Sequence, residues 1–333
     1  MVESEGSNQM SAPAIITQKD RIPGGLWGSL VGDALGVPVE FKARATVQLD
    51  LVKDMREYGT HRQPRGTWSD DSSMILCTTD SLLNHEFSLA DMGDRFVRWM
   101  KDGLWTAHGD VFDMGGTTCT ALMRIAKGIA ADQAGGRSED SNGNGSLMRI
   151  LPVVLRFAPE PIESFAGRLE KASAITHGHA RSQMACVFYG LVIRQLLLGW
   201  HPCAAVDSAR AEFTGWYEKS AEFSRFRHIL EDDLVSMPDG EVVSTGYVLH
   251  TLHASLWCLL TTQNFQDCVL KAVNLGGDTD TTGCVAGGLA GVAYGMKTIP
   301  ADWIGQLARK GDVDCLFHEF ADVCVETEEK KVS

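Results

Sequence analysis

The sequence lacks the features that mark nucleic-acid-binding and membrane proteins. Its 30 lysines and arginines are outnumbered by 43 aspartates and glutamates, which gives a net charge of −13. A basic patch for nucleic acid or for an anionic membrane surface is therefore not expected. The most apolar stretch, residues 283–295, is too short and too rich in glycine to span a bilayer. An anionic small ligand stays compatible, because bound cations can invert the local field.

Disulfides, a signal peptide and a covalent nucleophile are also missing from the pattern. The nine cysteines are odd in number, and no two have C-x-x-C spacing. Residues 1–20 carry early acidic side chains and no apolar core, unlike a secretory signal. We therefore expect free thiols in a reducing cytoplasm. The sequence has no Gly-x-Ser-x-Gly elbow, and no cysteine stands in an evident catalytic context.

Strand patterns and internal repeats are scarce, whereas helical spacing is common. Apolar residues follow three polar motifs at intervals typical of one helix face, for example Ile75, Leu76, Leu82 and Leu83. Residues 132–146 are rich in Gly, Ser, Asn and Asp and predict a long loop. We predict one mostly α-helical domain over residues 21–325. A flexible arm, residues 1–20, and a charged tail, residues 326–333, flank it.

The most informative features present are two short acidic clusters, at residues 66–71 and 276–281. Each supplies two carboxylates and a hydroxyl, begins with glycine, and precedes a helical pattern: Ser69, Asp70 and Asp71 in the first, Asp278, Asp280 and Thr281 in the second. A pair of hard divalent cations needs oxygen ligands from more than one segment. The alternative is that each cluster only caps a helix, since Ser, Thr and Asp are preferred there. The sequence leaves both open.

Three further motifs contain candidate polar groups. Asp33 and Glu40 flank Pro38, which ends the preceding helical pattern, and Asp33 is expected to be buried with a structural partner. Residues 142–149, ending in Arg149, offer glycine-flanked backbone N–H groups that could approach phosphates. A plain turn before a helix is the alternative there. His177 and His179 do not specify zinc without a third soft ligand.

Taken in order, these segments resemble the ADP-ribosylglycohydrolase family, which includes the dinitrogenase reductase-activating glycohydrolase. The resemblance spans residues 23–297, and the last of its motifs is the most specific. The motifs are Gly28–Glu40, Trp68–Asp71, Asp113–Gly115, Asn144–Arg149, Thr176–His177 and Gly276–Gly283.

The resemblance implies an all-α fold, a compact helical domain with a di-metal cleft for two divalent cations, Mg²⁺ or Mn²⁺. The implied metal ligands are Ser69, Asp70, Asp71, Asp278, Asp280 and Thr281. The implied substrate-binding residues are Asn144, Gly145, Ser146, Met148 and His177. Asp113, Glu40 and Asp280 are the implied catalytic residues. Two positions vary: Ser69 stands where the family often has Thr, and Gly116 where its pattern can have Asn.

The predicted function is that of a metal-dependent hydrolase that removes ADP-ribose from protein arginine. A metal-activated water would attack the anomeric carbon. One alternative is another ADP-ribose linkage, to serine, to O-acetyl-ADP-ribose or to a nucleotide. Another is an immunity protein that also blocks an ADP-ribosylating toxin with its 1–20 arm. An inactive relative is disfavoured, because all six implied ligands are present.

Overall fold

Helices form all the regular secondary structure of the described residues. The fold is a computed structural model that describes residues 16–332, with side chains as far as Val325. The α-helices of the first half are α1 (Gln18–Gly36), α2 (Arg44–Leu49), α3 (Asp70–Asn84), α4 (Leu89–Asp102), α5 (Gly116–Ala126), α6 (Ala131–Ala134), α7 (Leu151–Phe157) and α8 (Ile162–Ala174). Those of the second half are α9 (Ala180–Leu197), α10 (Pro202–Tyr217), α11 (Arg227–Glu231), α12 (Val248–Leu260), α13 (Phe265–Val273), α14 (Thr279–Tyr294), α15 (Ala301–Gln306) and α16 (Lys310–Val332).

Short 3₁₀-helices and isolated bridges connect these helices. The 3₁₀-helices are η1 (Val37–Val39), η2 (Glu139–Ser141), η3 (Phe223–Phe226), η4 (Asp239–Glu241) and η5 (Met296–Thr298). Pairing of the β type is limited, over residues 16–332, to three single bridges, such as that between Gly143 and Tyr247. The all-α prediction is therefore confirmed. The loop expected over residues 132–146 is partly helical, because α6 and η2 fall within it.

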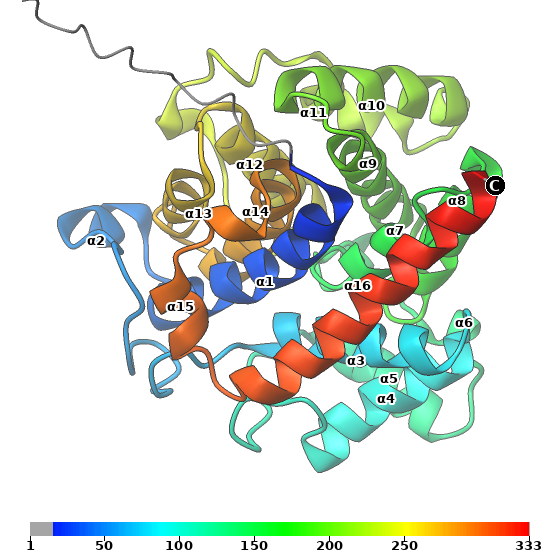
Figure 1. The fold of residues 1–333 in the computed structure, drawn as a ribbon, viewed down its shortest axis with the longest axis horizontal. Helices are drawn as coiled ribbons and strands as arrows, with labels where there is room; N and C mark the ends of the chain where they lie inside the picture. Colours follow the sequence, from blue (N-terminus) through cyan, green and yellow to red (C-terminus); the bar gives the residue numbers. More distant parts are fainter. Residues whose placement is uncertain (1–15, 333) are drawn as a thin grey trace, which may run out of the picture.

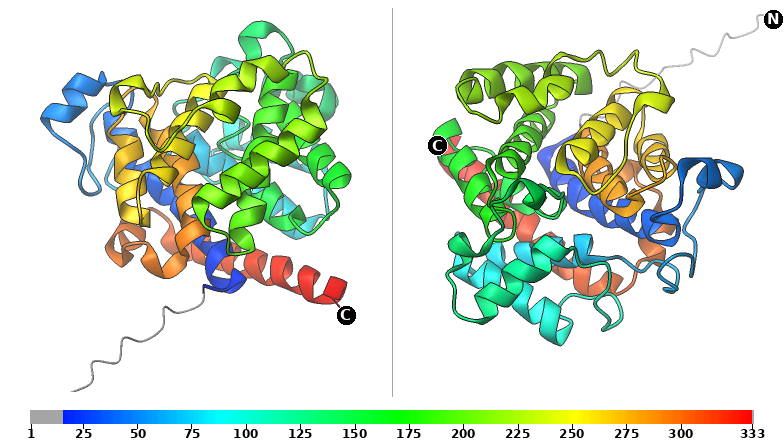
Figure 2. Two further views of the ribbon diagram at one scale, coloured as in Figure 1. Left: turned by 90° about the horizontal axis from the view of Figure 1, so that it is seen from above. Right: turned by 180° about the vertical axis from the view of Figure 1, so that it is seen from behind.

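Helices α1 and α14 lie side by side at the centre of the molecule (Figure 1). Helices α12 and α13 pack on α14, α3 and α16 contact α1 from another side, and α9 carries α8 and α10. The views of Figure 2 show α2 standing out from the body and α16 lying along its outside. The buried side chains of these helices form one continuous apolar core. Two acidic helix starts, those of α3 and α14, can therefore be held by the same central helix.

The contact between α1 and α14 is made through glycines on both helices. A Cβ atom added to Gly28 would lie 2.3 Å from the carbonyl oxygen of Gly287. One added to Gly32 would lie 2.0 Å from the carbonyl oxygen of Gly283. Gly24 and Gly291, one turn away on each helix, repeat the arrangement, so the two backbones run antiparallel in direct contact. Only glycine permits this approach.

The boundaries at both chain ends differ from the sequence expectation. Helix α1 begins at Gln18, so residues 18–20 are part of the first helix and not of an arm. Residues 1–15 of the expected arm lie outside the described residues. At the other end, α16 continues to Val332, so the backbone of the expected tail is helical as far as that residue.

The thiols and the helix lengths bear on two further expectations. The nine cysteines, all within the described residues, are thiols, as the sequence predicts. Among residues 16–332, no helix combines the length and the apolar character that crossing a membrane would require.

We predict that Gly32→Ala destabilises the protein by about 1–3 kcal/mol, because the new methyl group must separate two backbones that are in contact. Chemical denaturation followed by far-UV circular dichroism measures the change. Gly167→Ala on α8 is the matched control, since a Cβ atom there meets nothing within 4 Å. Because alanine favours a helix more than glycine does, Gly167→Ala should leave the free energy of unfolding unchanged or raise it by up to about 1 kcal/mol. Equal stability of both variants would contradict the described contact.

Candidate metal centre and cavity

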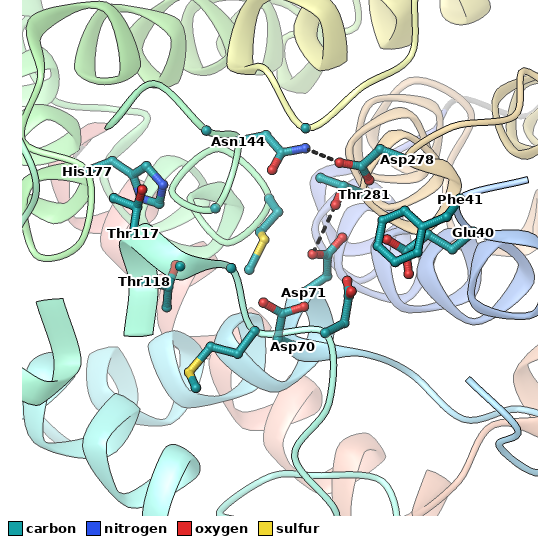
Figure 3. A pocket seen from close by; sticks show the side chains of 18 residues that line it. Glu40, Phe41, Asp70, Asp71, Thr117, Thr118, Asn144, His177, Asp278 and Thr281 are labelled. Atoms are coloured by element: carbon teal, nitrogen blue, oxygen red, sulfur yellow. Dashed lines mark hydrogen bonds between the residues drawn. The ribbon is translucent and has the colours of Figure 1, made fainter. Parts of the chain in front are cut away.

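The two acidic clusters meet in space, at the N-termini of α3 and α14. Asp70 and Asp71 lie in the first turn of α3, Asp278 directly precedes α14, and Thr281 lies in its first turn. The hydroxyl of Thr281 donates to Oδ1 of Asp71 at 3.3 Å, although the two residues are 210 positions apart in the chain. Figure 3 shows this bond at the floor of the cavity. The helix N-termini favour negative charge here.

The second cluster depends on two glycines with left-handed backbone geometry. Gly276 and Gly277 have φ angles of 73° and 74°. A Cβ atom on Gly277 would lie 2.1 Å from the carbonyl oxygen of Ser244. The turn that aims Asp278 at the cavity is therefore available to this sequence because both positions are glycine.

Asp33, on α1, holds the first cluster in place. This carboxylate is fully buried and accepts hydrogen bonds from the backbone N–H groups of Ser69 and Ser72, at 3.0 Å each. The hydroxyl of Ser72 also donates to it. These contacts satisfy the free N–H groups at the start of α3 and confirm that Asp33 is buried with structural partners.

The carboxylates of both clusters retain oxygen atoms without hydrogen-bond partners. Within the described part of the chain, the buried atoms Asp71 Oδ2, Asp278 Oδ1 and Asp280 Oδ2 accept no hydrogen bond. Glu40, Asp278 and Asp280 each present an oxygen within 4.8 Å of the others. Buried anionic oxygens left unpaired are costly, and a divalent cation with oxygen ligands removes that cost. The donor set therefore fits a hard cation.

Burial and mutual repulsion raise the pKa values of these carboxyl groups. Burial first, and then the charge of Asp278, raises the pKa of Glu40 to about 8. Burial and then the charge of Glu40 raise the pKa of Asp113 to about 8. The pKa values of Asp71 and Asp280 lie well above the usual range for the same two causes, burial first. So many carboxylates cannot all be ionised together unless cations are present.

A cavity of about 500 Å³ opens directly above the clusters. Glu40, Asp70, Asp71, Asp278 and Thr281 form its acidic side. Its other walls come from five segments of the chain, and those residues are Phe41, Asp113, Met114, Gly115, Gly116, Thr117, Thr118, Gly143, Asn144, Gly145, Met148, His177 and Gly246. A cavity of this size holds a small ligand, and the glycine-rich walls present backbone groups to it.

Asn144 and His177 lie on the wall across the cavity from Phe41 and Glu40 (Figure 3). The amide of Asn144 donates to Asp278 Oδ2 and to the hydroxyl of Thr251, both at 2.9 Å. Asn144 therefore orients a carboxylate of the acidic cluster. Burial, followed by the charge of Arg149, lowers the pKa of His177 to about 3. The imidazole is thus neutral and can offer or accept a hydrogen bond at the cavity surface.

Four expected site residues do not line the cavity. The Ser69 hydroxyl accepts from the backbone N–H of Asp71, as a helix cap does. Asp280 is fully buried below the floor, within reach of Glu40. Ser146 faces inward, where its hydroxyl accepts from Ser173 at 2.9 Å. Arg149, considered for phosphate contact, is fully buried and donates to the Thr176 hydroxyl, so it does not reach the cavity.

Sequence reasoning missed several groups around the cavity. His61 bonds the carboxylate of Glu40 and lies 3.9 Å from Oδ1 of Asp113, so it links two loops. Phe41 also lines the cavity and had not been identified. His61 follows no motif and carries no sequence signal. Phe41 stands directly beside Glu40, and its apolar side chain at a loop position was the available clue.

We predict that Asp33→Asn weakens metal binding about 10–100-fold, because an amide cannot replace all three bonds that hold the start of α3. Isothermal titration with Mn²⁺ measures the affinity without turnover. Asp314→Asn on α16 is the control, since Asp314 is half exposed and remote from the cavity. An unchanged Mn²⁺ affinity in a folded Asp33→Asn protein would show that α3 is positioned by other contacts.

The metal-free protein should lose stability as the pH rises from 6.5 to 8. Glu40 and Asp113 keep protons in the folded state in this range, whereas their unfolded pKa values are 4.5 and 3.8. Unfolding then releases protons, so the free energy of unfolding falls, by on the order of 1–2 kcal/mol. Denaturation in EDTA at the two pH values measures it. Saturating Mg²⁺ should abolish this loss of stability, and the Glu40→Gln substitution should make it smaller. If the free energy of unfolding of the metal-free protein does not change with pH, the proposed charge repulsion is refuted.

Comparison of the whole chain with known proteins identifies its family. The family model described as ADP-ribosylglycohydrolase matches residues 15–330. The chain is 30% identical to the ADP-ribosylarginine hydrolase Tri1 of Serratia proteamaculans (strain 568), covering 87% of this chain and 76% of that protein. It is 31% identical to the ADP-ribosyl-[dinitrogen reductase] glycohydrolase of Rhodospirillum rubrum, and the match covers 90% of this chain and 94% of that protein.

A solved structure agrees with the sequence relatives. It is described as an ADP-ribosylglycohydrolase-related protein complex, and it superposes with a TM-score of 0.78 at 32% identity, covering 92% of this chain and 99% of that one. The resemblance stated from the motifs is thereby confirmed, as is the prediction of a hydrolase. With a family model over nearly the whole chain and relatives of matching length and fold, the protein belongs to the ADP-ribosylglycohydrolase family.

Proposed function

We propose that this protein hydrolyses the bond between ADP-ribose and a protein arginine, with two divalent cations, Mg²⁺ or Mn²⁺, bound below the cavity. One observation carries the proposal. Three buried carboxylate oxygens, contributed by both acidic clusters, have no hydrogen-bond partner within the described residues, and the two clusters meet at a ligand-sized cavity. Such an arrangement is stable when cations occupy it. The ligands would be Asp70, Asp71, Asp278, Asp280 and Thr281, with Ser69 beside them.

Divalent cations in such a centre supply Lewis acidity and lower the pKa of water. The chain's own groups supply the rest of the reaction. Asn144 holds Asp278 in place, and the glycine-flanked loop from Gly143 to Gly145 gives the substrate close access to the backbone. The carboxylates beneath the cavity stabilise positive charge that develops on the ribose ring as the bond breaks. His177, neutral at physiological pH, binds the ligand through its Nε2 side.

Asp113 and Glu40 are proposed as the proton-transfer groups. Burial is the largest cause of the raised pKa of each group, and it does not depend on the charge of the neighbouring carboxylates, so it favours the protonated form that can donate. The bond between the anomeric carbon and the guanidine nitrogen breaks, that nitrogen takes the proton, and the oxygen of water forms the new bond to carbon. The proton that the water loses passes to the carboxylate left by the donor, which restores the acid. The products are ADP-ribose and unmodified arginine. His61, which bonds Glu40 and approaches Asp113, orients the two groups relative to one another.

Arginine is preferred over other linkages for two reasons. The relatives at about 30% identity include one named for ADP-ribosylarginine. In addition, the loop that carries Asp113 places a carboxylate at the cavity wall, where a departing guanidine needs one. Other ADP-ribose linkages remain the second candidate, because the acidic centre and the cavity describe the sugar and not the group attached to it.

The test is release of ADP-ribose from an arginine-ADP-ribosylated protein, with Mg²⁺ or Mn²⁺ and with EDTA. We expect metal-dependent release by the wild type and a loss of at least about 100-fold in Asp280→Ala. Asp314→Ala, which replaces a half-exposed aspartate on α16, is the matched control and should keep wild-type activity. Full activity of Asp280→Ala would refute its assignment. Release from serine but not from arginine would redirect the function to the other linkage.

A further inference from the structure

Phe41 is an aromatic side chain in the cavity wall that stays largely exposed. It is 65% accessible, although neighbouring Glu40 is buried. Burying a phenylalanine completely is worth about 1.5–3 kcal/mol, and this residue forgoes most of that gain. Figure 3 shows its ring beside Glu40, on the same side of the cavity as Asp278. An aromatic ring at the rim of an acidic cavity is available for contact with a ligand bound there.

The backbone holds Phe41 firmly in this position. Its φ angle is 60°, a left-handed geometry that is unfavourable for a bulky residue. The N–H of Phe41 donates to the carbonyl oxygen of Gly277 at 2.7 Å, and the N–H of Gly277 donates to the carbonyl oxygen of Lys42 at 2.9 Å. Two hydrogen bonds therefore join this segment to the turn that carries Asp278. Strain of this kind is found where function requires a particular placement.

An aromatic pair and two carboxyl groups lie together around Phe41. The rings of Phe41 and His61 are arranged edge to face, with centroids 5.9 Å apart. His61 bonds Glu40 and lies 3.9 Å from Asp113, so the aromatic face and two carboxyl groups gather at one corner of the cavity. Asp113 also has a left-handed backbone, with a φ angle of 61°. Two loops therefore place an aromatic ring and a carboxylate at this corner through unfavourable backbone geometry.

We propose that Phe41 binds the arginine side of the substrate by stacking its ring on the guanidinium group, beside the carboxyl group of Asp113. A guanidinium is planar, is weakly hydrated on its faces, stacks on aromatic rings and pairs with carboxylates in its plane. Phe41 is then a specificity-determining residue for the leaving group. This inference rests on the proposed function, since it names the group attached to ADP-ribose.

The test is inhibition of wild-type, Phe41→Leu and Phe41→Tyr proteins by free L-arginine, L-citrulline and ADP-ribose. Leucine keeps an apolar side chain but removes the aromatic face, so the inhibition constant of arginine should rise about five- to tenfold. In Phe41→Tyr, which keeps an aromatic ring, the inhibition constant of arginine should stay within about twofold of the wild-type value. The constants for ADP-ribose and for citrulline, which is neutral, should barely change. Tyr58→Leu is the control: Tyr58 is 59% exposed with a φ angle of 62° and does not line the cavity.

The outcomes separate this inference from the proposed function. If the wild type releases ADP-ribose from arginine but the inhibition constant of free L-arginine is the same in Phe41→Leu, only this inference is overturned and the proposed function stands. An equal rise in the ADP-ribose constant would also overturn it, because the ring would then contact the nucleotide. A wild type that releases no ADP-ribose from arginine would overturn the proposed function, and this inference with it.

Discussion

The backbone contact between α1 and α14 is the constraint on which the site depends. Successive residues of an α-helix point about 100° apart, so Gly32 and its neighbour Asp33 serve different faces of α1. Gly32 lies against α14, while Asp33 reaches the start of α3. One helix thereby sets the separation between two acidic helix N-termini. A side chain in place of the glycine would move α14, and with it half of the carboxylates, away from the other half.

The acidic floor concentrates charge that the apolar core cannot solvate. Helix N-termini and the bonds from Asn144 and Thr281 offset part of that charge. They leave buried oxygens of Asp71, Asp278 and Asp280 without partners in the described residues. Stability of the empty protein and readiness to bind cations therefore oppose each other here. The same groups whose pKa values are raised by burial and repulsion are those that a cation would stabilise.

The helical frame carries several residues of the cavity on the loops between its helices. Phe41 and Asp113 have left-handed backbones, and Gly276 and Gly277 make the turn before α14. His61 connects the first two loops through Glu40. Backbone geometry of this kind is retained because the packed helices on either side determine it. The helices fix the acidic floor, whereas the loops shape the cavity wall around Phe41 and Asp113.

The sequence by itself determined the helices, the family and most of the acidic floor, because helical spacing and capping chemistry are local properties. It pointed to Asp70, Asp71, Asp278 and Glu40 before any geometry was known. Only the tertiary structure decided which side chains face the cavity. Ser146 and Arg149 turn inward and His61 enters the site from a segment without a motif, because those placements depend on packing between helices that are distant in the chain.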